Sequence, residues 1–181
     1  PIFNADRRAN GVIDFATVLQ VSSNVAMVDV MSRVKRPHFW RWLHTLGIDD
    51  VPDTDLPGAV AGQLKSKSEF VGSAIEPATA AFGQGFSLTP LKLVQLHAML
   101  ANGGKLVSPH ITRGLRSGDA LAGTSRGSGV QLLDPKVTRI VVDWMETVVQ
   151  KGSGKGLQIP DRKSTRLNSS HSSVSRMPSS A

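Results

Sequence analysis

The sequence contains no cysteine, which excludes disulfide bonds, thiolate metal sites and a cysteine nucleophile. This absence does not indicate a compartment, because reducing and oxidising compartments both hold cysteine-free proteins. No uninterrupted apolar run approaches the roughly 20 residues that a membrane-spanning helix needs. The chain begins with Pro1 rather than methionine, and no signal-like segment precedes the globular sequence. We therefore expect an internal part of a longer protein.

Length and composition fit one folded domain or part of a larger one. The 181 residues are 40% hydrophobic and 19% charged, which excludes a highly charged disordered chain. The net charge of +7 would suggest nucleic acid. However, four basic residues and one acidic residue lie in residues 161–181, so three of these seven charges belong to the end of the chain. The aromatic residues are not interleaved with basic ones, and we predict no nucleic-acid binding.

Residues 161–181 differ in composition from the rest of the chain. They are rich in serine, lack apolar periodicity and are expected to be disordered. The stretches Asp161 to His171 and Ser175 to Ala181 back-translate into nucleotide sequences that resemble a common sequencing-library adapter. We therefore expect the biological chain to stop at about Pro160 and residues 161–181 to be translated adapter. A natural serine-rich tail is the alternative.

Apolar spacing and capping residues predict several helices in residues 1–160. Asp14 is a candidate cap for a short helix, Ser22-Ser23-Asn24 lies at the start of a second, and Pro37 suits the start of a third. Thr89-Pro90 begins an apolar helix that we expect to be central and buried, and Asp134-Pro135 begins an amphipathic helix that ends at Gly152.

The remaining segments of residues 1–160 predict little regular structure. Residues 49–75 and 114–129 are rich in glycine, proline or serine and predict loops, and residues 105–111 predict a strand interrupted by Pro109. The pattern is typical of the helical part of a mixed α+β fold.

Most candidate sites favour a structural interpretation. His38 and His44 are six residues apart, lie on different faces of a predicted helix and lack a cluster of carboxylates, so no metal is expected. Gly83-Gln84-Gly85 has Leu88 where a dinucleotide loop needs glycine, and no cofactor is predicted. The Ser22-Ser23-Asn24 triplet is by itself most simply a helix N-terminus.

Three segments together resemble the transpeptidase domain of class B penicillin-binding proteins. They are VLQVSSNVAM (18–27), FGQGFSLTPLKLVQLHAMLANGG (82–104) and VVQKGSGK (148–155), and their order and spacing agree with that family. The resemblance covers residues 1–160 as a partial domain. It implies an α+β fold, namely the mostly helical portion of the penicillin-binding-protein and serine β-lactamase-like transpeptidase fold, truncated at both ends.

The resemblance implies three motifs, S-x-x-K with the nucleophilic serine, S-x-N, and K-[ST]-G on an edge strand. Only S-x-N is matched, by Ser22 and Asn24. Ser22 would then form a hydrogen bond with the lysine of S-x-x-K and pass a proton to the leaving D-alanine. The Asn24 amide would hold that lysine and a carbonyl of the stem peptide. Ser23 has no assigned role. Ser32 and Lys35 have S-x-x-K spacing, but they follow S-x-N at a helix end and are rejected.

The resemblance predicts a bacterial serine D,D-transpeptidase that forms an acyl-enzyme, cross-links peptidoglycan in cell division or cell-shape maintenance, and binds β-lactams. Its implied partners are D-Ala-D-Ala stem peptides, a glycosyltransferase and other division or elongation proteins. Its implied location is the cell membrane, with the catalytic domain on the outer, periplasmic face. The 181-residue chain, which lacks the nucleophile and K-[ST]-G, is expected to be inactive. A D,D-carboxypeptidase, a penicillin-sensing relative and a non-catalytic scaffold remain alternatives.

Overall fold

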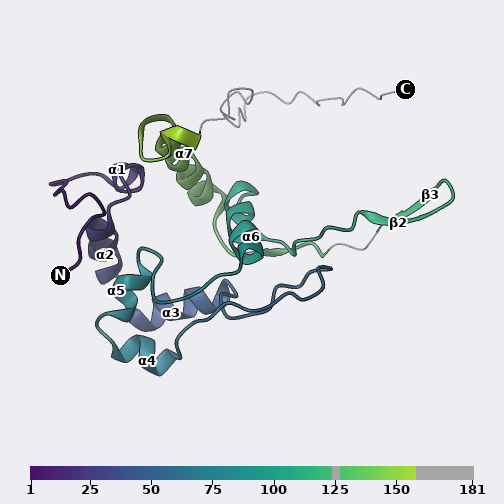
Figure 1. Cartoon of the computed structure of the whole chain (residues 1–181), viewed down its shortest axis with the longest axis horizontal. Helices are drawn as coiled ribbons and strands as arrows, with labels where there is room; N and C mark the ends of the chain where they lie inside the picture. Colours follow the sequence, from purple (N-terminus) through teal and green to yellow (C-terminus); the bar gives the residue numbers. More distant parts are fainter. Residues whose placement is uncertain (124–126, 158–181) are drawn as a thin grey trace.

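The computed structural model describes residues 1–123 and 127–157. Helices dominate these residues, and the strands are short (Figure 1). In chain order the elements are α1 (Phe15–Gln20), α2 (Asn24–Ser32), α3 (Arg36–Thr45), α4 (Lys67–Gly72), α5 (Glu76–Ala80), α6 (Pro90–Ala101), β1 (Lys105–Leu106), β2 (Gly114–Ser117), β3 (Ala120–Gly123), β4 (Val130–Gln131), α7 (Pro135–Lys151) and a 3-10 turn (Lys155–Leu157). The expected mixed, mostly helical fold is confirmed.

Side-chain caps determine where three of the predicted helices begin. The Asp14 carboxylate accepts a hydrogen bond from the Thr17 N–H (2.8 Å), Thr89 Oγ1 accepts one from Lys92 (3.1 Å), and Asp134 accepts one from Lys136 (2.7 Å). Each bond satisfies a backbone donor that has no partner within its own helix. The predicted starts of α1, α6 and α7 are therefore confirmed.

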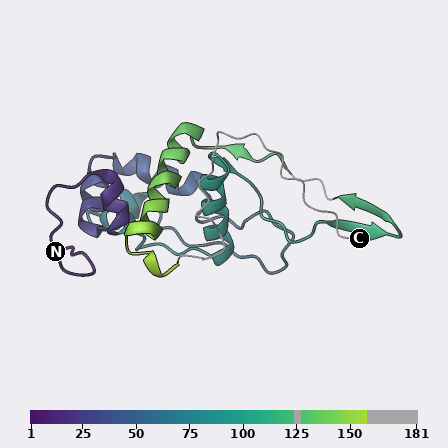
Figure 2. The ribbon, with the colours of Figure 1, turned by 90° about the horizontal axis from the view of Figure 1, so that it is seen from above.

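A small hydrophobic core joins α3, α4 and α5. Its buried members are Leu43, Ile48, Phe70 and Ala80. The Phe39 ring meets the Phe70 ring edge to face, with 5.5 Å between their centroids. In Figure 1 these three helices lie together in the lower part of the molecule, while α6 and α7 lie next to each other above them. Figure 2 shows α6 and α7 side by side as well.

The prediction that α6 is central and buried holds for only part of the helix. The side chains of Leu93 and Val94 are 46% and 63% exposed, and the buried positions of the helix are Lys92, Gln95 and Met99. Gln95 is held by a hydrogen bond from its side-chain nitrogen to the Val107 carbonyl (2.8 Å). Apolar composition overestimated burial here, because one face of α6 is covered by other described elements and the face with Leu93 and Val94 is not.

Two segments that we expected to be loops contain regular structure. In residues 49–75, Ser66 and Glu69 form a reciprocal capping box that starts α4, with bonds of 3.1 and 3.3 Å. In residues 114–129, β2 and β3 pair antiparallel around a turn in which Gly118 has φ +58°. A two-residue hairpin turn needs such positive φ values. This hairpin projects from the helical body (Figure 1).

The predicted strand at residues 105–111 is confined to β1, which pairs antiparallel with β4. The predicted boundary at Pro160 and residues 161–181 lie outside the described residues. Within the described part of the chain, no helix has the length and apolar character to span a membrane.

Candidate active site

The predicted motif occupies the tight corner between α1 and α2. The chain leaves α1 through backbone bonds from the Ser22 N–H to the Leu19 carbonyl and from the Ser23 N–H to the Val18 carbonyl, both 3.1 Å. Ser22 takes a left-handed conformation with φ +54°. This conformation is unfavourable for a residue with a Cβ, and such strain concentrates at functional sites in proteins.

Ser23 has a structural role that the sequence interpretation left unassigned. Its side chain is buried and caps α2, accepting a hydrogen bond from the Ala26 N–H (3.3 Å). The same hydroxyl donates to the side-chain oxygen of Asn4 (3.1 Å). The middle residue of the motif therefore holds the corner in place.

The two predicted site residues flank this buried serine. Ser22 is exposed, and among the described residues only its backbone N–H makes a hydrogen bond. Asn24 is half-buried at the first position of α2, and its amide nitrogen donates to the Phe3 carbonyl (3.2 Å). The corner thus presents a free hydroxyl and a partly accessible carboxamide, two groups suited to exchanging protons and hydrogen bonds with a ligand.

The turn after α7 lies against the same corner. The Ser153 N–H donates to the Gln20 carbonyl (3.1 Å), and the Gly152 backbone is in close contact with that residue. Phe15 of α1 and Trp144 of α7 meet edge to face with 5.3 Å between centroids. The GSGK segment, which follows α7, is therefore held beside the residues that lead into the motif.

Ser32 and Lys35, the rejected S-x-x-K pair, are not arranged as a nucleophile and its base. Ser32 is the last residue of α2, where its hydroxyl donates to the Asp29 carbonyl (2.6 Å), and Lys35 precedes α3.

The two histidines considered as metal ligands bind different partners. His38 accepts a hydrogen bond from Trp42, and His44 pairs with Asp49 (2.9 Å), which raises the pKa of His44. Within residues 1–123 and 127–157, no three metal-ligating side chains cluster.

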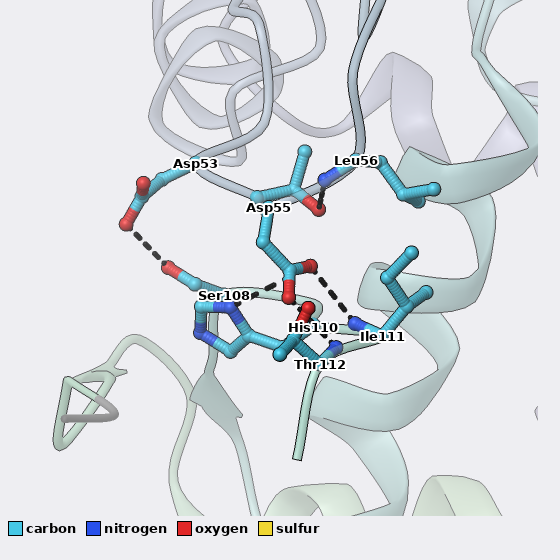
Figure 3. A network of polar contacts seen from close by, with 8 residues as sticks. Asp53, Asp55, Leu56, Ser108, His110, Ile111 and Thr112 are labelled. Carbon is cyan, nitrogen blue, oxygen red and sulfur yellow. Dashed lines mark hydrogen bonds and ion pairs between the residues drawn. The ribbon is translucent and has the colours of Figure 1, made fainter. Parts of the chain in front are cut away.

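A second polar network lies away from this corner, where residues 53–56 meet residues 108–112 (Figure 3). The Asp55 carboxylate accepts from the Ile111 N–H (2.9 Å) and the Thr112 N–H (2.7 Å), and Asp53 accepts from the Ser108 hydroxyl (3.0 Å). Hydrogen bonds from Thr112 and Ile111 lower the pKa of Asp55 to about 2. These bonds hold two loops together.

A model of the penicillin binding protein transpeptidase domain matches residues 2–167. The match therefore extends past the predicted boundary at Pro160, and that boundary stays a prediction.

Two curated relatives are each named a peptidoglycan D,D-transpeptidase FtsI homolog. The protein of Chlorokybus atmophyticus is 43% identical over 118 residues, which cover 64% of this chain and 17% of the relative. The protein of Mesostigma viride is 31% identical over 167 residues, which cover 83% of this chain and 28% of the relative. The chain thus spans less than a third of the length of either relative.

Solved structures of penicillin-binding proteins share the fold. The transpeptidase domain of penicillin-binding protein 3 from Burkholderia pseudomallei is 26% identical, with a TM-score of 0.70 over 84% of this chain and 44% of that one. Penicillin-binding protein 3 from Mycobacterium tuberculosis, complexed with aztreonam, is 25% identical, with a TM-score of 0.72 over 81% of this chain and 34% of that one.

Proposed function

Because the chain belongs to the penicillin-binding protein transpeptidase family, we propose that the complete protein is a serine D,D-transpeptidase that cross-links the stem peptides of peptidoglycan. The observation that carries this proposal is the Ser22-Ser23-Asn24 corner, in which a strained, exposed serine and an accessible asparagine flank a buried cap. The names of the curated relatives support the same activity.

The reaction consists of two acyl transfers. A serine hydroxyl attacks the carbonyl of the D-Ala-D-Ala bond, the peptide bond breaks, and the terminal D-alanine leaves with a proton on its amine. The amine of a second stem peptide then attacks the acyl-serine ester and releases the serine. The nucleophile belongs to an S-x-x-K motif, whose lysine accepts the serine proton.

Ser22 and Asn24 serve this reaction without forming the covalent bond. The Ser22 hydroxyl is free to receive a hydrogen bond from the lysine and to donate to the departing amine nitrogen. Asn24 has both a donor and an acceptor, so its carboxamide can hold the lysine ammonium and a peptide carbonyl together. In the described structure one of its two amide N–H groups donates to the Phe3 carbonyl, and the second N–H can donate to a substrate carbonyl.

The same chemistry defines the inhibitors and partners of the protein. A β-lactam presents a strained amide to the same serine, and a related protein has been crystallised with aztreonam. We propose that the complete protein is anchored in the cell membrane with its catalytic domain on the outer face. There it works with a glycosyltransferase and with other proteins of cell division or elongation.

Labelling with a fluorescent penicillin tests the proposal. The complete protein, including the sequence that precedes Pro1, should become covalently labelled, and labelling should stop when the serine of its S-x-x-K motif is replaced by alanine. Product analysis with a donor and an acceptor peptide should reveal a cross-linked dimer. Release of D-alanine without a dimer would indicate a D,D-carboxypeptidase, and absence of labelling would indicate a scaffold.

The 181-residue chain provides an internal control. Its sequence contains no K-[ST]-G motif, and its single S-x-x-K match is the rejected pair Ser32 and Lys35. We propose that this chain is inactive and takes no label, so labelling at Ser32 would overturn the assignment of roles.

A further inference from the structure

Asn4 is a buried polar residue that contacts the S-x-N corner from a distant part of the sequence. Its side chain is only 8% exposed, although it lies near the beginning of the chain. Its oxygen accepts hydrogen bonds from the Ser23 hydroxyl (3.1 Å) and from the Val25 N–H (3.2 Å). One side chain therefore binds two groups at the start of α2.

The orientation of the Asn4 carboxamide is set from its other end. Its nitrogen donates to the Arg8 carbonyl (2.8 Å), which places the oxygen toward α2. The preceding residue, Phe3, accepts the bond from the Asn24 side chain. Residues 3–8 thus form a bracket around the motif, with contacts to both Ser23 and Asn24.

The bracket formed by residues 3–8 helps to keep Ser22 in its strained conformation. Ser22 keeps its positive φ only as long as its neighbours fix the backbone on both sides, because the relaxed conformation of a serine has negative φ. On the α1 side, backbone bonds fix the chain. On the α2 side, the Ser23 hydroxyl both caps the helix and is anchored by Asn4.

We propose that Asn4 is a positioning residue for acyl transfer, because it holds the corner that aims Ser22 and Asn24. This inference rests on the proposed function. The Asn4 side chain bonds to Arg8, Ser23 and Val25, so it acts through Ser23 and the start of α2. Without its oxygen, the Ser23 hydroxyl and the Val25 N–H lose their acceptor, and the corner relaxes away from the geometry that acylation needs.

The test measures acylation of the complete protein by a fluorescent penicillin in stopped-flow experiments, which separate the acylation rate constant from the dissociation constant of the first complex. Asn4→Ala removes the acceptor and should lower the acylation rate constant by about 10-fold to 100-fold, the loss expected for a misplacement near 1 Å. Asn4→Asp keeps an acceptor for Ser23 and Val25 at the N-terminus of α2, where a negative charge is favoured, but it loses the donor to the Arg8 carbonyl, so it should restore part of the rate.

Thr138→Ala is the matched structural control. Thr138 is also buried, and among the described residues its hydroxyl bonds to carbonyls at the start of its own helix, α7. This variant should melt at a lower temperature and acylate at the unchanged rate. Together the three variants separate loss of positioning from loss of stability.

Each outcome decides a separate claim. Slow acylation in Asn4→Ala, partial rescue in Asn4→Asp and normal acylation in Thr138→Ala would support the positioning role. Normal acylation in Asn4→Ala, or an equal loss in Asn4→Ala and Thr138→Ala at equal melting temperatures, would overturn it. If the unaltered complete protein takes no label, the proposed function fails instead.

Discussion

Gly152, the residue that ends α7, packs its backbone directly against Gln20, the last residue of α1. A Cβ at position 152 would overlap the Gln20 carbonyl oxygen. The neighbouring Ser153 N–H donates to that same oxygen. The contact between the two helices therefore needs a residue without a side chain at position 152.

Gly152→Ala should destabilise the complete protein by about 1–3 kcal/mol, the usual cost of forcing extra atoms into a packed site. The φ and ψ of Gly152, −102° and −153°, are accessible to alanine, so steric overlap alone causes the loss. Thermal and urea unfolding would measure it. The matched control is Gly156→Ala in the same segment, where a new Cβ meets nothing within 4 Å. Equal stability of both variants would contradict the contact.

Substitutions of Ser22 should separate its strain from its chemistry. Ser22→Gly removes the penalty of a positive φ and should stabilise the fold by roughly 1 kcal/mol. Ser22→Ala keeps the strain and should leave stability nearly unchanged. Both variants lose the hydroxyl, so both should slow acylation by labelled penicillin. A Ser22→Gly protein no more stable than Ser22→Ala would argue against the left-handed conformation.

Asn24→Ala in the complete protein should slow acylation by about 100-fold, the loss expected when a group that positions the lysine and the substrate carbonyl is removed. The fold should lose little, because the side chain makes one hydrogen bond to the Phe3 carbonyl and such a bond contributes about 1 kcal/mol. Stopped-flow labelling measures the acylation rate, and thermal unfolding measures the stability of the fold. An unchanged acylation rate would remove Asn24 from the mechanism.

Asp55 should make stability depend on pH at low pH. Its pKa is lowered from 3.8 to about 2 by bonds from Thr112 and Ile111, so the unfolded chain binds more protons than the folded one between these values. Stability should therefore fall as the pH drops from about 4 to about 2.

Asp55→Asn tests this dependence by denaturant unfolding at several pH values. The variant should be less stable than the unaltered protein above pH 4, and the difference should shrink toward pH 2. Asp119→Asn, at an exposed carboxylate of the β2–β3 turn, is the control and should follow the unaltered protein. A constant difference across this pH range would argue against the network in Figure 3.

The proposed boundary at Pro160 is tested by genomic DNA. We expect the gene to continue after Pro160 with codons other than those for DRKSTRLNSSH, and to encode a K-[ST]-G motif nearby. Resequencing of genomic DNA that instead returns codons for Asp161 to His171 would overturn the adapter interpretation.

Local features of this fold were predictable because they depend on neighbouring residues. Asp14, Thr89 and Asp134 each cap a helix whose first N–H groups lie two or three positions away, so the sequence reveals both partners. The α4 capping box, Ser66 with Glu69, is equally local. The glycines and prolines around it nevertheless led to the prediction of a loop.

The sequence by itself determined the starts of α1, α6 and α7, the family and the two candidate site residues, Ser22 and Asn24, since motif spacing and capping act over a few residues. Only the tertiary structure decided that Ser23 is buried, that α6 leaves Leu93 and Val94 exposed, and that Asn4 and Gly152 hold the corner. These properties arise from contacts between residues far apart in the chain, 19 positions in the case of Asn4 and Ser23. Burial and long-range hydrogen bonds exist only once the helices have packed, and so no local pattern records them.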